Sequence, residues 1–158
     1  MYNQSVPDFR FHHPIEVRYG DLDPQGHVNN ARYLTYLEQA RIAYIQALGL
    51  WKGGSFLDVG IILADARVTF KAPIQYGTPV RVRVRITRIG NKSLTMEYLL
   101  EDADSGQYLA TGASVLVAYD YHRASAIPIP DDWRITISKF EGLDGSTVEA
   151  IDDEPPLD

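Results

Sequence analysis

Only one long stretch of the chain has a helical hydrophobic period, and it begins beside two asparagines. Its apolar side chains recur every three or four residues, at Tyr33, Leu34, Leu37, Ala40, Tyr44, Ala47 and Leu48. That spacing places them on one face of an α-helix. Asn29 and Asn30 suit its start, because an Asn side-chain oxygen accepts a bond from a free backbone N–H, and Gly49 suits its end. The sequence therefore predicts a helix of about five turns.

Elsewhere apolar and polar residues alternate, which is the period of half-buried strands. We expect strands over 11–19, 61–70, 79–89, 94–101 and 108–119. Short gaps at 90–93 and 102–107 contain turn residues and join neighbouring strands as antiparallel hairpins. In 80–89, valine and isoleucine alternate with arginine and threonine, so one face is core and the other meets water or an anionic partner. Two prolines then end the pattern, and over 131–140 we expect one helical turn or a loose segment.

These elements predict an α+β fold in which one long central helix packs on an antiparallel five-stranded sheet. A helix of about 28 Å cannot cover five strands completely. The uncovered part of the sheet therefore predicts that two copies of the chain associate, most simply as a two-fold dimer.

The length of the chain suits one domain, and its charge distribution distinguishes a neutral segment over 1–143 from an acidic segment over 144–158. The chain has 158 residues, 45% of them hydrophobic, which is enough for one core. Its formal charge of −6 arises in 144–158, where six acids stand without a Lys or Arg. The remaining 15 acids equal the 15 bases in number. We expect a folded domain over 1–143 and an acidic, disordered tail over 144–158.

Several features that would indicate other classes of protein are missing. Without cysteine, the chain has no disulfide, thiolate nucleophile or Cys-ligated metal. No apolar run approaches the ~20 residues that span a bilayer, and 1–13 lacks the pattern of a secretory signal. A cytoplasmic protein without a membrane partner is therefore expected. The neutral body and the lack of a basic helix argue against nucleic acid as a partner.

The loop over 17–30 concentrates the candidate chemistry, and its sequence is V-R-Y-G-D-L-D-P-Q-G-H-V-N-N. Asp21 and Asp23 can simply accept backbone N–H bonds in a turn. A calcium loop would need a glutamate at its twelfth position, where this chain has Arg32, so that interpretation fails. His27 has no second histidine at metal-ligand spacing, and no metal site is expected.

A third interpretation of the loop uses its position directly before a helix. The N-terminus of a helix carries about half a positive charge and free N–H donors. A carbonyl oxygen docked there would be polarised, as in an oxyanion hole. An Asp a few residues upstream could then attack the carbonyl carbon or activate water, which suffices for acyl transfer from a thiolate leaving group.

The run over 19–34, continued by L-E-Q-A-R at 37–41, resembles the signature of hot-dog-fold acyl-CoA thioesterases of the 4-hydroxybenzoyl-CoA thioesterase family. The likeness extends over roughly 11–122 in loop, helix and strand order. It implies hydrolysis of an acyl-CoA substrate to free acid and coenzyme A, with no separate cofactor. It also implies a homodimer, or a dimer of dimers.

The resemblance assigns roles within the loop. The family's catalytic carboxylate is the Asp before proline, which is Asp23 here. The backbone N–H that polarises the thioester carbonyl maps to Asn30, with Asn29 as the alternative. His27 is expected to position the substrate or the loop, and Asp21 to hold the loop in shape.

The resemblance also implies contacts to the substrate. It places the acyl pocket between subunits, lined partly by Tyr33, Tyr36 or Tyr44. Coenzyme A carries phosphates, and the cations that could meet them are Arg67, Lys71, Arg88 and Lys92, together with Arg81, Arg83 and Arg85. Glu38 is interpreted as the partner of Arg41 or Arg67 in an ion pair, not as a catalytic acid.

Two other functions remain open at this point. A hot-dog dehydratase or hydratase needs a His and an acid in one site, and His27 with Asp23 could supply them. A non-catalytic module that binds acyl-CoA is the second alternative.

Overall fold

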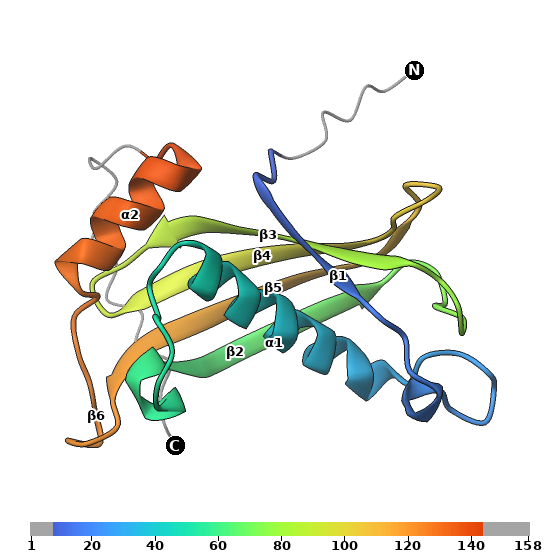
Figure 1. The fold of residues 1–158 in the computed structure, drawn as a ribbon, viewed down its shortest axis with the longest axis horizontal. Helices are drawn as coiled ribbons and strands as arrows, with labels where there is room; N and C mark the ends of the chain where they lie inside the picture. Colours follow the sequence, from blue (N-terminus) through green and yellow to red (C-terminus); the bar gives the residue numbers. More distant parts are fainter. Residues whose placement is uncertain (1–7, 144–158) are drawn as a thin grey trace.

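One antiparallel sheet, crossed on one face by a helix, forms the body of the protein (Figure 1). The computed structural model describes residues 8–143, so the predicted acidic tail over 144–158 lies outside the described residues. In chain order the elements are β1 (Phe11–Ile15), the 3-10 helix η1 (Tyr19–Asp21), α1 (Asn30–Ala47), the 3-10 helix η2 (Phe56–Val59), β2 (Ile61–Phe70), β3 (Val80–Ile89), β4 (Ser93–Asp102), β5 (Tyr108–Asp120), β6 (Ser125–Ala126) and α2 (Asp131–Glu141). All five predicted strand regions contain a strand. No helix within 8–143 is long and apolar enough to cross a membrane.

The sheet has the strand order β1-β3-β4-β5-β2, with the short β6 added beside β5. All of these pairs are antiparallel, as the hairpin spacing predicted. β1 covers only the first half of β3, from Val80 to Val84. β2 pairs with β5 along its whole length, and within residues 8–143 no strand pairs with its other side. β2 is therefore a long open edge.

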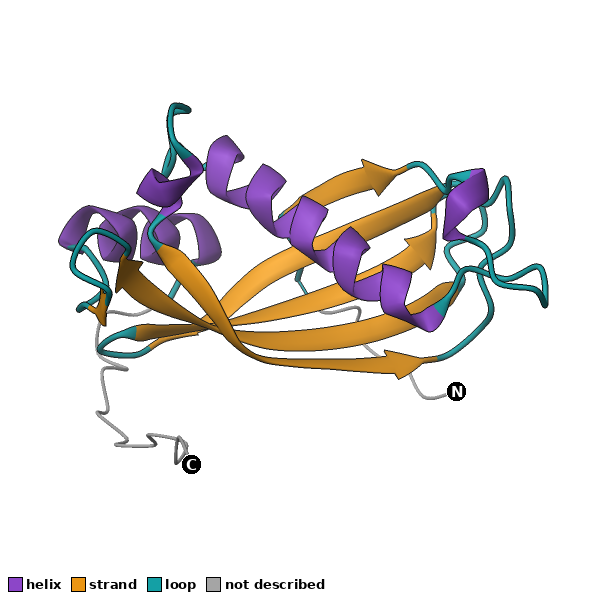
Figure 2. Cartoon of the chain, turned by 90° about the horizontal axis from the view of Figure 1, so that it is seen from below, coloured by secondary structure: helices purple, strands orange, loops and turns teal. Residues whose placement is uncertain are grey.

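α1 lies across one face of the sheet (Figure 2), and its tyrosine side chains are buried. Tyr33, Tyr36 and Tyr44 are buried, whereas Leu34, which the predicted stripe included, is exposed. Close approach depends on Gly112 of β5, where an added Cβ would lie 3.1 Å from Cδ1 of Leu37. The buried face of the helix is thus rotated from the stripe that spacing alone indicated.

The arginines of β3 occupy the opposite face of the sheet from the core. Nε of Arg81 and Nε of Arg83 donate to Oε1 of Glu101 at 2.7 and 2.6 Å. Nη2 of Arg85 donates to Oε2 of Glu97 at 2.6 Å. The anionic partner of this face therefore belongs to the neighbouring strand β4 of the same sheet.

α2 corrects the expectation of a single helical turn or a loose segment over 131–140. It is an 11-residue helix that buries Trp133 and Ile137. Two acids in its first turn complement the helix dipole, and Gly142 ends it with a φ of 67°. Nη2 of Arg134 donates to the carbonyl of Gly90 at 2.6 Å, which fastens α2 to the β3–β4 turn.

Candidate active site

The loop after η1 closes on itself as a short hairpin. The N–H of Asp23 donates to the carbonyl of His27 at 2.8 Å, and that of Gly26 donates to the carbonyl of Asp23 at 3.0 Å. Gly26 has a φ of 80°, a conformation that glycine adopts without steric cost. The N–H of Val28 donates to the carbonyl of Ile74 at 2.8 Å, which ties the loop to the segment after β2. These bonds fix the position of Asp23.

Asp23 uses one carboxylate oxygen for the turn. Its Oδ1 accepts the N–H of Gln25 at 2.9 Å, as a turn carboxylate does. Its Oδ2 accepts no hydrogen bond from residues 8–143, and the side chain is half-buried. The second oxygen therefore remains available to a substrate or a water molecule.

Asp21 is a buried anion that joins η1 to α1. Its side chain is 1% exposed, and its Oδ2 accepts the N–H of Arg18 at 3.0 Å and the hydroxyl of Tyr36 at 2.7 Å. Burial opposes its ionisation, but these two bonds and the charges of Arg18 and Arg32 outweigh that effect. They hold the pKa of Asp21 below its ordinary value.

In the first turn of α1, one N–H group has no acceptor among residues 8–143. The N–H of Asn29 donates to the carbonyl of Asp21 at 2.8 Å. Oδ1 of Asn29 accepts the N–H of Ala31 at 2.9 Å, and its carbonyl accepts the N–H of Arg32 at 2.9 Å. The N–H of Asn30 donates to no acceptor within the described part of the chain. The free donor of this helix N-terminus is therefore Asn30.

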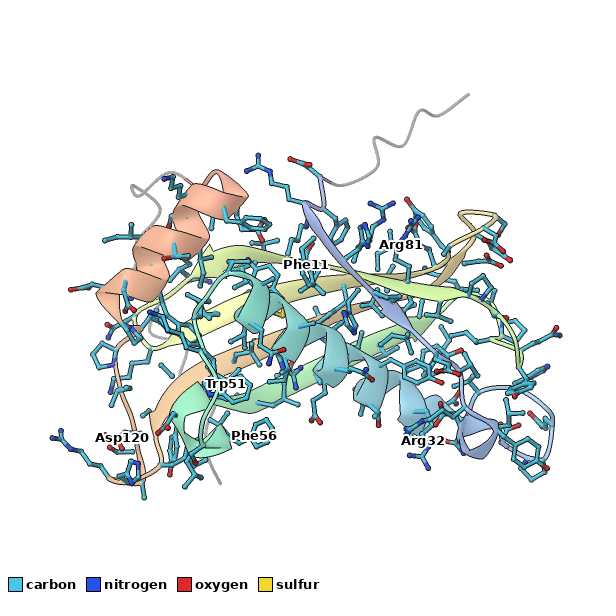
Figure 3. All side chains as sticks on the ribbon, viewed as in Figure 1. Phe11, Arg32, Trp51, Phe56, Arg81 and Asp120 are labelled. Carbon is cyan, nitrogen blue, oxygen red and sulfur yellow. The ribbon has the colours of Figure 1, made fainter. Side chains whose placement is uncertain are left out.

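A pocket of about 320 Å³ lies where the loop, the start of α1 and the end of β2 meet. Its lining residues are Asp23, Gln25, His27, Val28, Asn30, Tyr33, Phe70, Lys71, Ala72 and Pro73. Figure 3 labels Arg32 at this end of α1 and Trp51 near its other end. The pocket thus brings together five residues singled out from the sequence: Asp23, His27, Asn30, Tyr33 and Lys71.

Of the three tyrosines proposed for an acyl pocket, only Tyr33 lines this one. Its ring meets Phe70 edge to face, with 4.8 Å between centroids. Burial raises the pKa of Tyr33, while a backbone hydrogen bond at Ile74 opposes the shift. Tyr36 and Tyr44 are buried at other positions along α1. Tyr33 and Phe70 form a neutral aromatic wall.

Of the seven cations predicted to meet phosphate, Arg81, Arg83 and Arg85 pair with glutamates of β4. The other four lie in three different places. Lys71 lines the pocket. Arg67 is exposed on β2, 3.7 Å from Asp65, and lines a different pocket of about 430 Å³. Arg88 and Lys92 flank the β3–β4 turn beside α2, away from the loop over 17–30 (Figure 1). One copy of the chain therefore brings only Lys71 to Asp23.

Outside the loop, the acid singled out on α1 forms an ion pair. Oε2 of Glu38 lies 3.9 Å from Nη2 of the buried Arg41, which is one of the two predicted partners. Nη1 of Arg41 also donates to the hydroxyl of Tyr98 at 3.2 Å. Within residues 8–143, no group of three or more His, Cys, Asp or Glu side chains is placed to hold a metal ion.

The structure adds residues that sequence reasoning missed. Phe70 and Pro73 reach the pocket from a segment distant in sequence, and no local signal pointed to them. Arg18 and Tyr36 hold Asp21. Arg18 lies inside the loop over 17–30, three residues before Asp21, so its proximity to Asp21 could have been anticipated from spacing.

A family model described as the thioesterase-like superfamily matches residues 17–137. Among solved structures, a thioesterase from Thermus thermophilus, complexed with coenzyme A and Zn, is 35% identical to this chain with a TM-score of 0.76. The similarity covers 87% of this chain and 98% of that one.

Several relatives have names that state an activity. The long-chain acyl-CoA thioesterase FadM of Escherichia coli (strain K12) is 22% identical over 76% of this chain and 91% of its own length. The 1,4-dihydroxy-2-naphthoyl-CoA hydrolase of Synechococcus elongatus is 26% identical over 81% of this chain and 96% of its own length.

Proposed function

The chain belongs to the thioesterase-like superfamily, and we propose that it hydrolyses an acyl-CoA thioester to a free carboxylic acid and coenzyme A. Its curled antiparallel sheet and C-terminal helix have the hot-dog thioesterase fold, and it is a thioester hydrolase. In this proposal α1 is the central helix, Asp23 is the catalytic carboxylate and Asn30 supplies the oxyanion donor. Membership of the narrower 4-hydroxybenzoyl-CoA thioesterase family stays a prediction.

The observation that carries the proposal is the free N–H of Asn30 in the pocket that Asp23 also lines. Hydrolysis of a thioester builds negative charge on the carbonyl oxygen. A backbone N–H at a helix N-terminus stabilises that charge, and it does so without reorganising as the charge develops. The neighbouring N–H groups already have acceptors, so Asn30 marks where the carbonyl oxygen docks.

Asp23 can act on the docked thioester by two routes. As a nucleophile, its carboxylate oxygen bonds to the carbonyl carbon while the carbon–sulfur bond breaks and coenzyme A leaves as thiolate. Water then cleaves the resulting anhydride, which releases the acid and restores Asp23. As a general base, Asp23 takes a proton from water while the water oxygen attacks, and it returns that proton to the departing sulfur. Both routes require an ionised Asp23 and the oxyanion donor.

The rest of the pocket suits an acyl thioester. Tyr33 and Phe70 supply an apolar wall for the acyl group, and Lys71 supplies a positive charge at the rim. His27 is fixed through its backbone, because its carbonyl accepts the N–H of Asp23 and its chain bridges to Gln75. We assign His27 a positioning role for the loop that carries Asp23.

The proposed enzyme is a homodimer built through β2. This edge strand exposes Ile62, Leu63 and Phe70, and Phe70 also lines the pocket. An open edge that exposes apolar side chains is a template for another strand. A second copy would therefore cover the edge and close one side of the pocket.

The charged residues of β2 would complement those of a second, antiparallel copy of the strand. Antiparallel pairing of two copies about Ala66 places Asp65 of one copy opposite Arg67 of the other. Two-fold symmetry repeats the same ion pair on the other side of the axis. Opposite charges directly across two strands stabilise their pairing.

The proposed function is tested by Asp23→Asn, with Asp104→Asn in an exposed turn as the matched control. We expect Asp23→Asn to fold with an unchanged unfolding midpoint and to lose roughly 10²–10⁴-fold in kcat. Thiol release from a panel of aliphatic and aromatic acyl-CoA substrates measures this loss. The control should retain activity. Wild-type turnover by Asp23→Asn would contradict the assignment, and hydration of an enoyl-CoA without thiol release would favour a hydratase.

A further inference from the structure

Two arginines beside the pocket share a single buried carboxylate. Nη2 of Arg18 lies 3.6 Å, and Nε of Arg32 lies 3.8 Å, from Oδ1 of Asp21. The arginine side chains are 67% and 45% exposed, while the carboxylate is 1% exposed. The buried carboxylate of Asp21 therefore pairs with both guanidinium groups, and the arginine side chains stay exposed to solvent.

The charges in this cluster do not balance, and the donors are not saturated. Two positive groups face one negative group. Each guanidinium has five N–H donors, and both distances exceed the 2.7–3.2 Å typical of N–H···O bonds. Glu101 differs, because it accepts short bonds of 2.7 and 2.6 Å from Arg81 and Arg83. Arg18 and Arg32 retain the capacity to bind an anion.

The position of Arg32 breaks a local rule of helix stability. It lies in the first turn of α1, which contains no acidic residue, and a positive charge there opposes the helix dipole. α2 follows the rule, with Asp131 and Asp132 in its first turn. A residue that weakens its own helix beside a reactive loop is expected at a functional site. An anion bound by both arginines would offset the unfavourable positive charge in the first turn of α1.

Two exposed tyrosines flank the same cluster. Tyr19, the neighbour of Arg18, is 82% exposed, and its ring meets the 63% exposed Tyr76 edge to face with 6.5 Å between centroids. Tyr76 follows Gln75, which bridges to His27 of the reactive loop. Exposed aromatic rings provide stacking surfaces for nucleotide bases.

We propose that Arg18 and Arg32 bind the phosphate groups of coenzyme A, and that Tyr19 and Tyr76 stack against its adenine. The identity of this ligand rests on the proposed function. Phosphate binds arginine by charge-assisted hydrogen bonds, and a nucleotide also offers a base to an aromatic ring. The thioester end occupies the pocket at Asp23, while the nucleotide end lies outside it, against the first turn of α1.

The site is tested by the affinity of the intact protein for coenzyme A, measured by calorimetry, with pantetheine as the probe that lacks phosphate. We expect the double variant Arg18→Gln/Arg32→Gln to bind coenzyme A at least tenfold more weakly than wild type. Its preference for coenzyme A over pantetheine should shrink by the same factor. Lys139→Gln removes one positive charge from an exposed position on α2, as the single variant Arg32→Gln does from α1, and should bind coenzyme A like wild type.

Folding and hydrolysis are separated from binding in the same experiment. Arg32→Gln alone removes a charge that opposes the helix dipole, so it should fold even where the double variant does not, and it should still weaken binding several-fold. Unchanged affinity of a folded variant for coenzyme A would overturn the site, and normal thiol release would then leave the proposed hydrolysis standing. Arginine-dependent binding of coenzyme A without thiol release would uphold the site and overturn the hydrolysis.

Discussion

At the scale of single residues, the proposed reaction depends on one backbone N–H. Three neighbouring donors of the first turn are taken up by Asp21 and Asn29, and the N–H of Asn30 is left over. In the proposed reaction, Asn30 therefore contributes through its backbone N–H and not through its side chain. This can be tested because proline removes an N–H and is tolerated at the first position of a helix.

We expect Asn30→Pro to keep the fold and lose roughly 10²–10³-fold in kcat, the usual cost of one oxyanion donor. The preceding Asn29 has φ −59° and ψ 137°, a conformation that a following proline favours. Asn30→Ala is the matched variant, because it removes the side chain and keeps the N–H. Steady-state kinetics measure kcat for both variants, and circular dichroism measures their helix content. Equal kcat values for the two folded variants would rule out the assigned donor.

Much of the candidate site could be predicted from the sequence, because its residues are close along the chain. Asp23, His27, Asn30 and Tyr33 fall within one loop and one helical turn, so local spacing brings them together. Phe70 reaches the pocket only through the pairing of β2 with β5, which single-residue patterns do not encode. The roles of these residues stay predictions until the variants are measured.

At the scale of elements, α2 completes an edge that β1 leaves open. β1 pairs with β3 only as far as Val84, so the N–H of Ile86 has no strand partner on that side. Oε1 of Glu141 accepts that N–H at 3.1 Å and the hydroxyl of Tyr44 at 2.6 Å. One carboxylate thereby joins α2, β3 and α1.

We expect Tyr44→Phe to lower the free energy of unfolding by roughly 1–3 kcal/mol, because it removes a buried donor from a carboxylate. Burial, and then the hydrogen bond and charge of Glu141, raise the pKa of Tyr44 and keep its hydroxyl protonated. Tyr121→Phe is the matched control, since Tyr121 is exposed and donates to the carbonyl of Ile61 at 2.9 Å. It should cost no more than about 0.5 kcal/mol. Both variants are measured by urea unfolding. Equal losses in the free energy of unfolding for Tyr44→Phe and Tyr121→Phe would contradict the stabilising role of the buried bond between Tyr44 and Glu141.

α2 escaped prediction because its sequence supports two periods. Trp133, Ile135 and Ile137 alternate with polar residues as in a strand, while Trp133 and Ile137 are also spaced as in a helix. In the structure Trp133 and Ile137 are buried and Ile135 is exposed, which is the burial pattern of a helix. The acidic first turn and Gly142 were the signals that could have decided between them.

At the scale of the whole molecule, the open β2 edge is the surface through which two copies of the proposed enzyme would associate. The sequence predicted association from an incompletely covered sheet. The structure now places three exposed apolar side chains, Ile62, Leu63 and Phe70, on β2, and Phe70 also lines the pocket. The strand regions along the chain and the two hairpins followed from periodicity and short gaps. The order of the strands in the sheet was not predicted, and the open edge depends on pairing between β2 and β5, which are distant in sequence.

We expect Arg67→Asp to weaken the dimer about tenfold, because it places like charges opposite each other at two symmetric positions. Adding Asp65→Arg to the same chain restores opposite charges across the axis and should restore the dimer. Sedimentation equilibrium over a range of concentrations measures both variants. The proposed register is wrong if the double variant dissociates as readily as Arg67→Asp, or if wild type is a monomer.

The arginine in the first turn of α1 has a consequence for evolution and engineering. A search for greater heat resistance would favour Glu at position 32, since an acid there suits the helix dipole. The same change would set a negative charge beside Asp21 and near the point where the thioester oxygen must become negative. Selection for catalysis and selection for robustness thus oppose each other at this residue, and a thermostabilised descendant is expected to keep Arg32 and gain its stability elsewhere.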